Sequence, residues 1–137
     1  MKVKLDNGAY MPVRAHDADA GLDLRTPTDV KLPAHGAVCI DTGVHIELPH
    51  GYYGKLESKS GLNVNFGIVS LGGVIDEGYS GSIVAKLYNT TDNEYWFSEG
   101  DKVVQMVIQP YIAPELEVVT ELDETDRNEK GFGSSGR

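Results

Sequence analysis

Residues 81–108 read GSIVAKLYNTTDNEYWFSEGDKVVQMVI, and this stretch decides the fold class. Short apolar or alternating runs are broken by turn formers, first the cluster 89–93 and then Glu99-Gly100-Asp101. Runs of 4–8 residues that alternate and are bounded by Gly, Asn and Asp are typical of β-strands with one buried face. The stretch therefore predicts successive strands over 81–88, 94–97 and 103–108, separated by turns.

The same pattern continues on both sides of this stretch. Strand-like runs precede it at 37–40, 44–48 and 52–56, and another follows at 114–119. No run keeps helical spacing over three turns without Gly or Pro, so only a turn or so of helix is expected after Ser60. We therefore predict an all-β fold, a barrel or sandwich, in which no linker or repeat divides the chain.

Composition and charge limit the function classes. The chain has 137 residues, of which 40% are hydrophobic and 24% charged, as in one globular domain. It has no apolar run of the roughly 20 residues that cross a bilayer, no signal-like N-terminus, and one cysteine, Cys39. We therefore expect a cytoplasmic protein with no membrane partner. The net charge of −9 argues against a nucleic-acid partner, which needs a broad basic face, but leaves room for a small phosphorylated ligand.

The segment GGVIDEGYSG at 72–81 combines a carboxylate with a phenol ring. Two apolar residues lead to Asp76, a Glu-Gly turn follows, and Tyr79 begins the next run. A carboxylate held at such a turn can act as a general base towards water. Taken alone, however, the segment favours a turn-capping Asp and a packing Tyr, which are common in β proteins.

Three further segments carry polar residues in positions that suit a phosphate. Lys59, Ser60 and Gly61 supply a charge, a hydroxyl and close backbone approach, although a solvated loop has the same composition. Asp23, between two leucines, is either a turn residue or a positioned anion. Gln105 lies inside an apolar strand, where an unpaired amide is costly, so it needs backbone or ligand partners.

The C-terminal segment differs from the rest of the chain. From Asp123 onward Phe132 is the one apolar side chain, and glycines are frequent. Such a segment cannot build a core, and its composition favours a disordered tail. The alternative is a Gly/Ser-rich loop that closes over an anion with its backbone N–H groups.

Taken together, five segments resemble a known family. They are AGLDL (20–24), SKSGL (58–62), GGVIDEGYSG (72–81), GDKVVQ (100–105) and RNEKGFGSSG (127–136). Their order strongly resembles the five motifs of the trimeric dUTP diphosphatase (dUTPase) family, from about residue 12 to residue 137. The resemblance implies a β jelly-roll or distorted β-barrel core over 1–122 and a flexible Gly-rich C-terminal arm over 123–137. It also implies a homotrimer whose active sites are shared between subunits, each closed by an arm.

The resemblance further implies hydrolysis of dUTP to dUMP and pyrophosphate, which limits uracil in DNA and supplies dUMP for thymidylate synthesis. By the resemblance Asp76 activates the water that attacks the α-phosphorus, and Gln105 contacts a phosphate or this water. The implied cofactor is Mg²⁺, held mainly by the substrate phosphates, with Asp23 contacting it through water.

The resemblance assigns the remaining site residues to parts of the substrate. Tyr79 packs against the deoxyribose, and backbone groups near Gly73 and Val84 read uracil. Lys59, Ser60 and Gly61 contact the phosphates, with Lys59 standing where the family usually has Arg. In the arm, Arg127 pairs with the γ-phosphate and Phe132 stacks on uracil, and the other implied contacts are Gly133, Ser134 and Ser135.

Two other functions remain open at this point. A dCTP deaminase, possibly bifunctional, shares the family fold, although such proteins are typically longer and often carry Trp at the position of Tyr79. A nucleotide-dependent regulatory protein is the alternative from another class. Members of that kind often carry an insertion between the third and fourth motifs, and this chain has little room for one.

Overall fold

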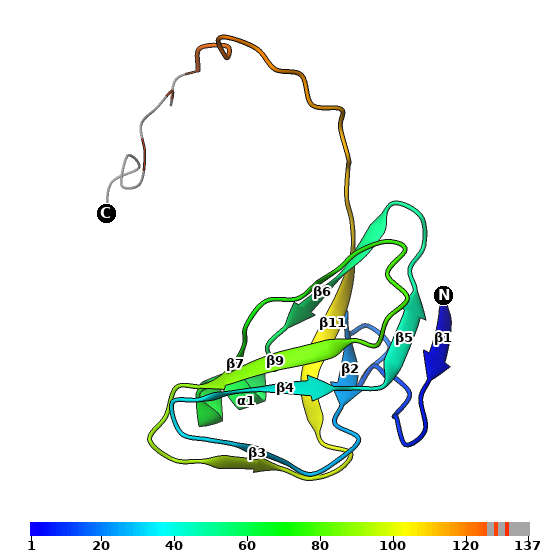
Figure 1. The fold of residues 1–137 in the computed structure, drawn as a ribbon, viewed down its shortest axis with the longest axis vertical. Helices are drawn as coiled ribbons and strands as arrows, with labels where there is room; N and C mark the ends of the chain where they lie inside the picture. Colours follow the sequence, from blue (N-terminus) through cyan, green and yellow to red (C-terminus); the bar gives the residue numbers. More distant parts are fainter. Residues whose placement is uncertain (126–127, 129–130, 132–137) are drawn as a thin grey trace.

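A computed structural model describes residues 1–125, 128 and 131, and residues 126–127, 129–130 and 132–137 lie outside the described part. The chain forms strands joined by turns, with one short helix (Figure 1). The elements are β1 (Lys2–Leu5), β2 (Gly21–Arg25), β3 (Val30–Leu32), β4 (Ala37–Asp41), β5 (Val44–Glu47), β6 (Tyr52–Glu57), α1 (Ser60–Phe66), β7 (Ile68–Ser70), β8 (Val74–Ile75), β9 (Val84–Asn89), β10 (Tyr95–Phe97) and β11 (Lys102–Pro110).

The strands pair into four small sheets, and every pair is antiparallel. Their orders are β2-β11-β6-β8, β4-β9-β7, β1-β5 and β10-β3. The all-β prediction is confirmed, and the arrangement is jelly-roll-like. Among the described residues the sheets do not close into a barrel.

Strand β11 lies in the interior of the largest sheet, because it is paired on both edges. Residues 102–107 pair with β2, and residues 105–110 pair with β6. Gly54 of β6 lies where a Cβ atom would meet the Met106 sulfur at 2.7 Å, so a larger residue would force the Met106 side chain to move. The glycine therefore permits the close packing of β6 on β11.

Local sequence explains how the strands end. Asn89, fully buried at the end of β9, donates from Nδ2 to the Asn93 carbonyl at 2.8 Å and accepts from the Thr91 amide at 3.0 Å. These bonds hold the turn 89–93 that the sequence predicted. Helix α1 ends at Gly67, whose φ of 62° is left-handed and favours glycine. The expected short helix after Ser60 is thus confirmed, although it contributes no buried residue.

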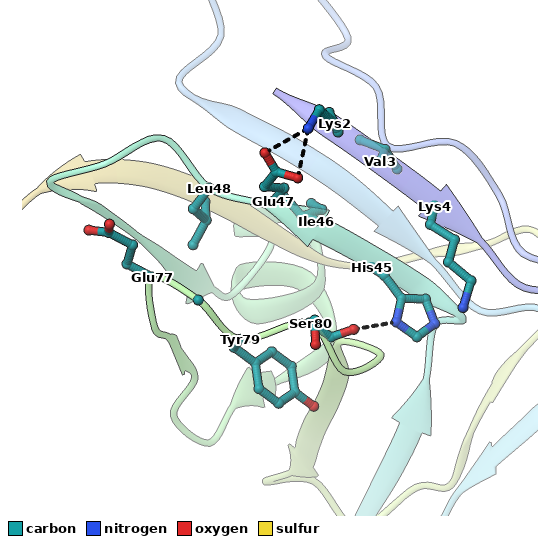
Figure 2. A pocket seen from close by; sticks show the side chains of 11 residues that line it. Lys2, Val3, Lys4, His45, Ile46, Glu47, Leu48, Glu77, Tyr79 and Ser80 are labelled. Atoms are coloured by element: carbon teal, nitrogen blue, oxygen red, sulfur yellow. Dashed lines mark hydrogen bonds and ion pairs between the residues drawn. The ribbon is translucent and has the colours of Figure 1, made fainter.

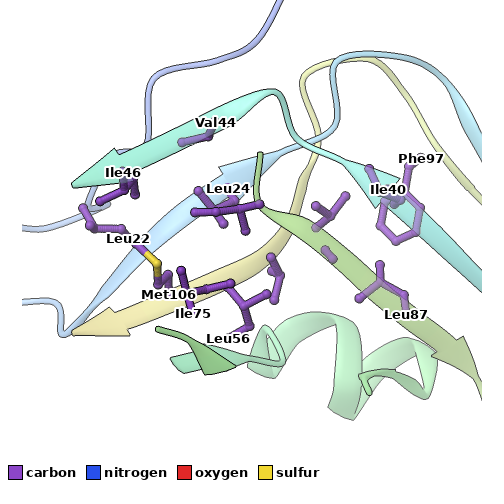
Figure 3. Packing of buried hydrophobic residues seen from close by; sticks show 14 of the residues in the cluster. Leu22, Leu24, Ile40, Val44, Ile46, Leu56, Ile75, Leu87, Phe97 and Met106 are labelled. Carbon is purple, nitrogen blue, oxygen red and sulfur yellow. The ribbon is translucent and has the colours of Figure 1, made fainter. Parts of the chain in front are cut away.

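The core lies between the sheets and draws side chains from most strands (Figure 3). Leu22 and Leu24 of β2, Met106 of β11 and Leu56 of β6 line the side that carries the largest sheet. Its other fully buried members include Leu87 of β9 and Phe97 of β10. Alternation works as the sequence suggested in β6 and β9, where buried residues alternate with more exposed ones, whereas β2 is buried at four consecutive residues.

The chain leaves the body of the domain after β11. Residues 111–125 run away from the sheets without regular secondary structure, and no strand forms over 114–119 (Figure 1). The expectation of a strand there is therefore wrong for the single described chain, because this segment has no neighbouring strand to pair with. No helix in the described part of the chain is long and apolar enough to cross a membrane.

Phe97 and Trp96 give a matched test of this core, because they are neighbours on opposite faces of β10. Phe97 is 1% exposed and Trp96 is 58% exposed. We expect Phe97→Ala to lower the free energy of unfolding by about 3–5 kcal/mol, since it leaves a cavity. Trp96→Ala should cost less than about 1 kcal/mol. Urea denaturation at a fixed protein concentration measures both, and equal losses would contradict the core described here.

Candidate functional site

A β-bulge in β11 brings two polar side chains of the predicted site region onto one face. Lys102 pairs with Arg25 and Gln105 with Asp23, and the register shifts between Lys102 and Val104. Residues three apart in a regular strand point to opposite faces. The extra residue at the bulge restores the shared face, so Lys102 and Gln105 both lie on the side of Asp23.

Asp23 is the centre of this group. Its side chain is buried, with the residue only 4% exposed, and it contacts two lysines. Lys59 Nζ contacts Asp23 Oδ1, and Lys102 Nζ lies 2.6 Å from Asp23 Oδ2. We call Asp23, Lys59, Lys102 and Gln105 the Asp23 cluster. It joins the first, second and fourth of the five segments in one place.

The two lysines decide the charge state of Asp23. Burial alone would raise the pKa of this carboxyl, but the hydrogen bonds and charges of Lys102 and Lys59 outweigh burial and leave the pKa below its usual value. Asp23 is therefore ionised at neutral pH, with one ammonium group on each oxygen. A single positive charge remains from the two lysines after this pairing, and both lysine side chains are partly exposed to solvent.

Gln105 has the partner that its position in an apolar strand requires. Its Nε2 donates to the Ser58 carbonyl at 3.1 Å, and Ser58 Oγ in turn accepts from the Ser70 amide at 2.8 Å. Gly21 lies so close that a Cβ atom there would overlap the Gln105 amide. The glycine of the first segment therefore makes room for the glutamine of the fourth.

The second group of site residues lies on a tight turn after β8, residues 76–79, which we call the Asp76 turn. The Tyr79 amide donates to the Asp76 carbonyl at 3.1 Å, and Gly78 has a φ of 86° at the third turn position. A type II turn requires a positive φ at that position, which explains the glycine. The side chains of Asp76 and Tyr79 are both exposed beside the turn.

Glycines on both sides shape the surroundings of Tyr79. A Cβ atom at Gly81 would overlap the Tyr79 ring, whose hydroxyl donates to the Ser82 carbonyl at 3.0 Å. Gly73, at a φ of 134°, lies where a Cβ atom would meet Leu56 at 2.6 Å. Val84, which begins β9, is 45% exposed. The ring is thus held in place and still presents a surface to solvent.

Next to Tyr79 lies an open cleft of about 590 Å³ between the Asp76 turn and strands β1 and β5 (Figure 2). His45 of β5 fixes its edge, with Nδ1 2.8 Å from the Ser80 carbonyl and Nε2 3.1 Å from Asp6 Oδ2. Both partners are acceptors, so both contacts are satisfied when the ring is protonated. The Ser80 carbonyl first and Asp6 second raise the pKa of His45.

The Asp23 cluster and the Asp76 turn do not meet within one chain. On β6, Glu57 pairs with Gln105 and Gly54 pairs with Ile75. These two positions of β6 are three residues apart, which is about 10 Å along the strand at roughly 3.3 Å per residue. Among the described residues, no hydrogen bond or ion pair joins the two groups. A single subunit therefore brings together two separate halves of the predicted site.

The other predicted site residues fall into two sets. Ser60 and Gly61 begin α1 directly after Lys59, and both are exposed. The arm residues lie outside the described part of the chain, namely Arg127, Phe132, Gly133, Ser134 and Ser135. Sequence reasoning missed Lys102, since a regular strand would have turned it away from Asp23. The adjacent valines Val103 and Val104, both buried, are the only local signal of the bulge.

Comparison with known proteins gives a consistent result. The family model described as dUTPase matches residues 7–136. A deoxyuridine 5'-triphosphate nucleotidohydrolase of Paramecium bursaria Chlorella virus 1 is 41% identical over 133 residues, covering 97% of this chain and 94% of that protein. The corresponding protein of Anaplasma marginale is 44% identical, with 94% of this chain and 90% of that protein covered.

Solved structures agree with the sequence relatives. A Staphylococcus bacteriophage 80alpha dUTPase with bound dUpNHpp superposes with a TM-score of 0.92 at 33% identity, covering 99% of this chain and 98% of that chain. A dUTPase from phage phi11 of S. aureus, described with a structural Mg(II) ion, gives a TM-score of 0.82 at 31% identity. It covers 90% of this chain and 98% of that chain.

The Asp23–Lys102 ion pair can be tested by its pH dependence. Lys102→Met keeps the side-chain stem and removes the ammonium group, so we expect the free energy of unfolding at pH 7 to fall by about 1–3 kcal/mol. Because the folded-state pKa of Asp23 is lowered, its pairing stabilises the fold above the unfolded-state pKa of about 3.9. That stabilisation is lost as pH falls through the folded-state value.

The loss caused by Lys102→Met should therefore shrink between pH 7 and pH 3, as measured by urea denaturation of the variant and the wild type. Lys86→Met is the control, because Lys86 is an exposed lysine of β9 that makes no ion pair in the described part of the chain. A loss of the same size at every pH would show that the pairing with ionised Asp23 is not its cause.

Proposed function

Since this chain belongs to the dUTPase family and hydrolyses dUTP to dUMP and pyrophosphate, we propose that Asp76 is its general base. The observation that carries this proposal is the Asp76 turn, which presents an exposed carboxylate three residues before the fixed ring of Tyr79. Asp76 takes a proton from a water molecule as its oxygen bonds to the α-phosphorus. The bond from the α-phosphorus to the bridging oxygen breaks, and pyrophosphate leaves.

We propose that the nucleoside binds beside the same turn. The Tyr79 ring, held against Gly81, packs on the deoxyribose and leaves no room for a 2′-hydroxyl. Backbone groups near Gly73 and Val84 read the uracil edge, and fixed N–H and C=O groups reject cytosine because its donor and acceptor pattern is reversed. Selectivity for both the base and the sugar would then come from the segment 73–84, which spans β8 and the loop before β9.

The triphosphate is proposed to lie along the Asp23 cluster. Ser60 and Gly61 hydrogen-bond the phosphates, and Gln105 contacts a phosphate or the attacking water. Lys59 supplies charge, since its ammonium group needs only to move from Asp23 to a phosphate oxygen. Lys59 replaces the guanidinium that is usual in the family, so it acts as a point charge without a bidentate fork.

Magnesium is proposed as the cofactor, and the residues present fit an ion held by the substrate. Among the described residues, no group of three or more His, Cys, Asp or Glu side chains could hold a metal ion. Both oxygens of Asp23 already contact ammonium groups, so direct coordination there would require their displacement, whereas a contact through water would not. Magnesium, when bound, neutralises the triphosphate and fixes its shape for in-line attack.

We propose a homotrimer with shared active sites. The two halves of the site lie apart within one chain, so residues from a second copy would complete each half. The segment after β11 supports the same proposal, because it exposes large apolar side chains that water solvates poorly. Their exposed fractions are 89% for Ile112, 94% for Leu116, 99% for Val118 and 87% for Leu122. A neighbouring copy of the chain is the occupant that would cover them.

The C-terminal arm, residues 123–137, is proposed to complete the site. Arg127 pairs with the γ-phosphate, Phe132 stacks on uracil, and Gly133, Ser134 and Ser135 enclose the terminal phosphates. Closing a segment over the substrate excludes water and aligns the triphosphate. A cytoplasmic location, without nucleic acid or membrane as partner, stays a prediction.

The base assignment predicts that Asp76→Asn lowers kcat for dUTP by about 10²–10⁴, because an amide cannot accept the proton from water. Binding of dUTP should be retained, since the amide keeps the shape of the carboxyl group. Pyrophosphate release is measured with dUTP, dCTP, dTTP and UTP, with and without Mg²⁺. Asp17→Asn, which alters an exposed acid far along the chain, is the control. Near wild-type turnover by Asp76→Asn would show that Asp76 is not the base.

Truncation after Glu124 tests the arm and the trimer together. The removed residues are mostly polar, so we expect the shortened chain to fold and to elute as a trimer in size-exclusion chromatography. Hydrolysis should fall by orders of magnitude, because the γ-phosphate and uracil contacts are lost. Full activity would contradict arm closure, and loss of the trimer would assign the arm a structural role.

A further inference from the structure

Glu77, the residue next to Asp76, is held by donors from two other parts of the chain. His50 Nδ1 lies 2.7 Å from Glu77 Oε1, and the Gly51 amide donates to Oε2 at 2.8 Å. The Tyr111 hydroxyl donates to the same Oε2 at 2.7 Å. His50 and Gly51 form the turn between β5 and β6, and Tyr111 is the first residue after β11. We call these contacts the Glu77 clamp.

The partners of Glu77 are themselves fixed. The Tyr111 amide donates to the Gly51 carbonyl at 3.0 Å, and the Tyr111 ring packs edge-on against Tyr53 with centroids 6.5 Å apart. Tyr53 in turn donates from its hydroxyl to Gln109 of β11 at 2.7 Å. The clamp therefore connects the Asp76 turn to the paired strands β6 and β11 through side chains that are themselves held in place.

Glu77 is ionised, which suits a side chain that accepts all of these hydrogen bonds. Its hydrogen bonds from His50, Tyr111 and Gly51 lower the pKa of Glu77 to about 2. The side chain is therefore a carboxylate at neutral pH, and both of its oxygens are acceptors. Only 25% of the side chain is exposed, whereas that of His50 is almost fully exposed.

Asp76 lacks comparable support of its own. Its side chain is exposed and makes no hydrogen bond within the described part of the chain, and the turn that carries it contains the permissive Gly78. Asp76, Glu77, Tyr53 and Tyr111 line one cavity of about 390 Å³, so the base and the clamp share a single environment. A catalytic group displaced by about 1 Å can cost roughly 10²-fold in rate.

We infer that Glu77 is a positioning residue for the reaction, which fixes the Asp76 turn to the β5–β6 turn and to the start of the C-terminal segment. The inference rests on the proposed role of Asp76 as the base. Tyr111 is the residue at which the chain leaves the sheets. Its hydrogen bond to Glu77 therefore also connects the Asp76 turn to the start of the segment that leads to the arm.

A merely structural clamp and a positioning clamp predict different kinetics. A purely structural role would lower the melting temperature when the contacts are removed and leave kcat unchanged. A positioning role lowers kcat while substrate affinity stays nearly constant, because Glu77 is not proposed to touch dUTP. Measuring kcat and KM separately therefore distinguishes a positioning role of Glu77 from a structural one.

The experiment compares Glu77→Ala, Glu77→Gln and Tyr111→Phe in the full-length protein. We expect kcat for dUTP to fall about 10–100-fold in Glu77→Ala, with KM and the Kd of dUpNHpp changed less than about 3-fold. Glu77→Gln should lose less, since one oxygen remains an acceptor. Tyr111→Phe should lose severalfold in the wild type and almost nothing further in Glu77→Ala, because the two residues act through one contact.

Two variants control for nonspecific effects. Tyr52→Phe removes a neighbouring hydroxyl that makes no hydrogen bond to a described residue, and Asp17→Asn removes an exposed charge outside both halves of the site. Both should keep wild-type kcat. Wild-type kcat in folded Glu77→Ala, or an equal loss in the controls, would overturn the inference. If Glu77→Ala does not fold, Glu77→Gln and Tyr111→Phe carry the same comparison.

Asp76→Asn, assayed in parallel, separates this inference from the proposed function. An inactive Asp76→Asn together with a fully active Glu77→Ala would refute the positioning role alone. A fully active Asp76→Asn would refute the base assignment, and the positioning role with it, whatever the Glu77 variants do. Loss of kcat in both variants, with affinity retained, supports both.

Discussion

The pairing of β11 on both of its edges is the constraint on which the rest of the site depends. On one edge β2 brings Asp23 opposite Gln105, and on the other β6 brings Glu57 opposite the same glutamine. The far edge of β6 carries β8, which ends at the Asp76 turn. A slip of one residue along β11 would turn its side chains to the other face, so the hydrophobic core and the site are aligned by the same register.

Charge balance supports the proposal that the triphosphate lies along the Asp23 cluster of this acidic protein. The whole chain has a net charge of −9, yet Lys59 and Lys102 together with Asp23 carry a local charge of +1, from two ammonium groups and one carboxylate. Asp23 also allows the two lysines to lie close together without repulsion. The positive charge of Lys59 and Lys102 is therefore in place before a ligand binds, and Asp23 offsets the repulsion between the two ammonium groups.

The sequence predicted those features that depend on local pattern. The alternation in 84–89 and 103–108, the turn at 89–93 and the short helix after Ser60 all depend on neighbouring residues, and the structure contains them. The short strands β1, β3 and β7 were missed, because three or four residues give too little alternation to detect. Strand β2 was missed as well, because Asp23 between two leucines was also compatible with a turn. The strand expected over 114–119 was wrong because pairing needs a neighbour that alternation cannot supply. Glu77 was invisible for a related reason: its donors lie 26, 27 and 34 residues away in the sequence.

The bulge in β11 has a consequence for how the length of this strand can vary. Lys102 pairs with Arg25, Val104 with Leu24 and Gln105 with Asp23, so Val103 is the residue left over. A deletion of Val103 would therefore leave every cross-strand pair intact and convert the bulge into a regular ladder, at the expense of one buried side chain. A deletion between Gln105 and Gln109 would instead shift the pairing with β2 or β6 and reverse the parity of the residues beyond it. Strand β11 should therefore tolerate a deletion best at Val103, the extra residue of the bulge.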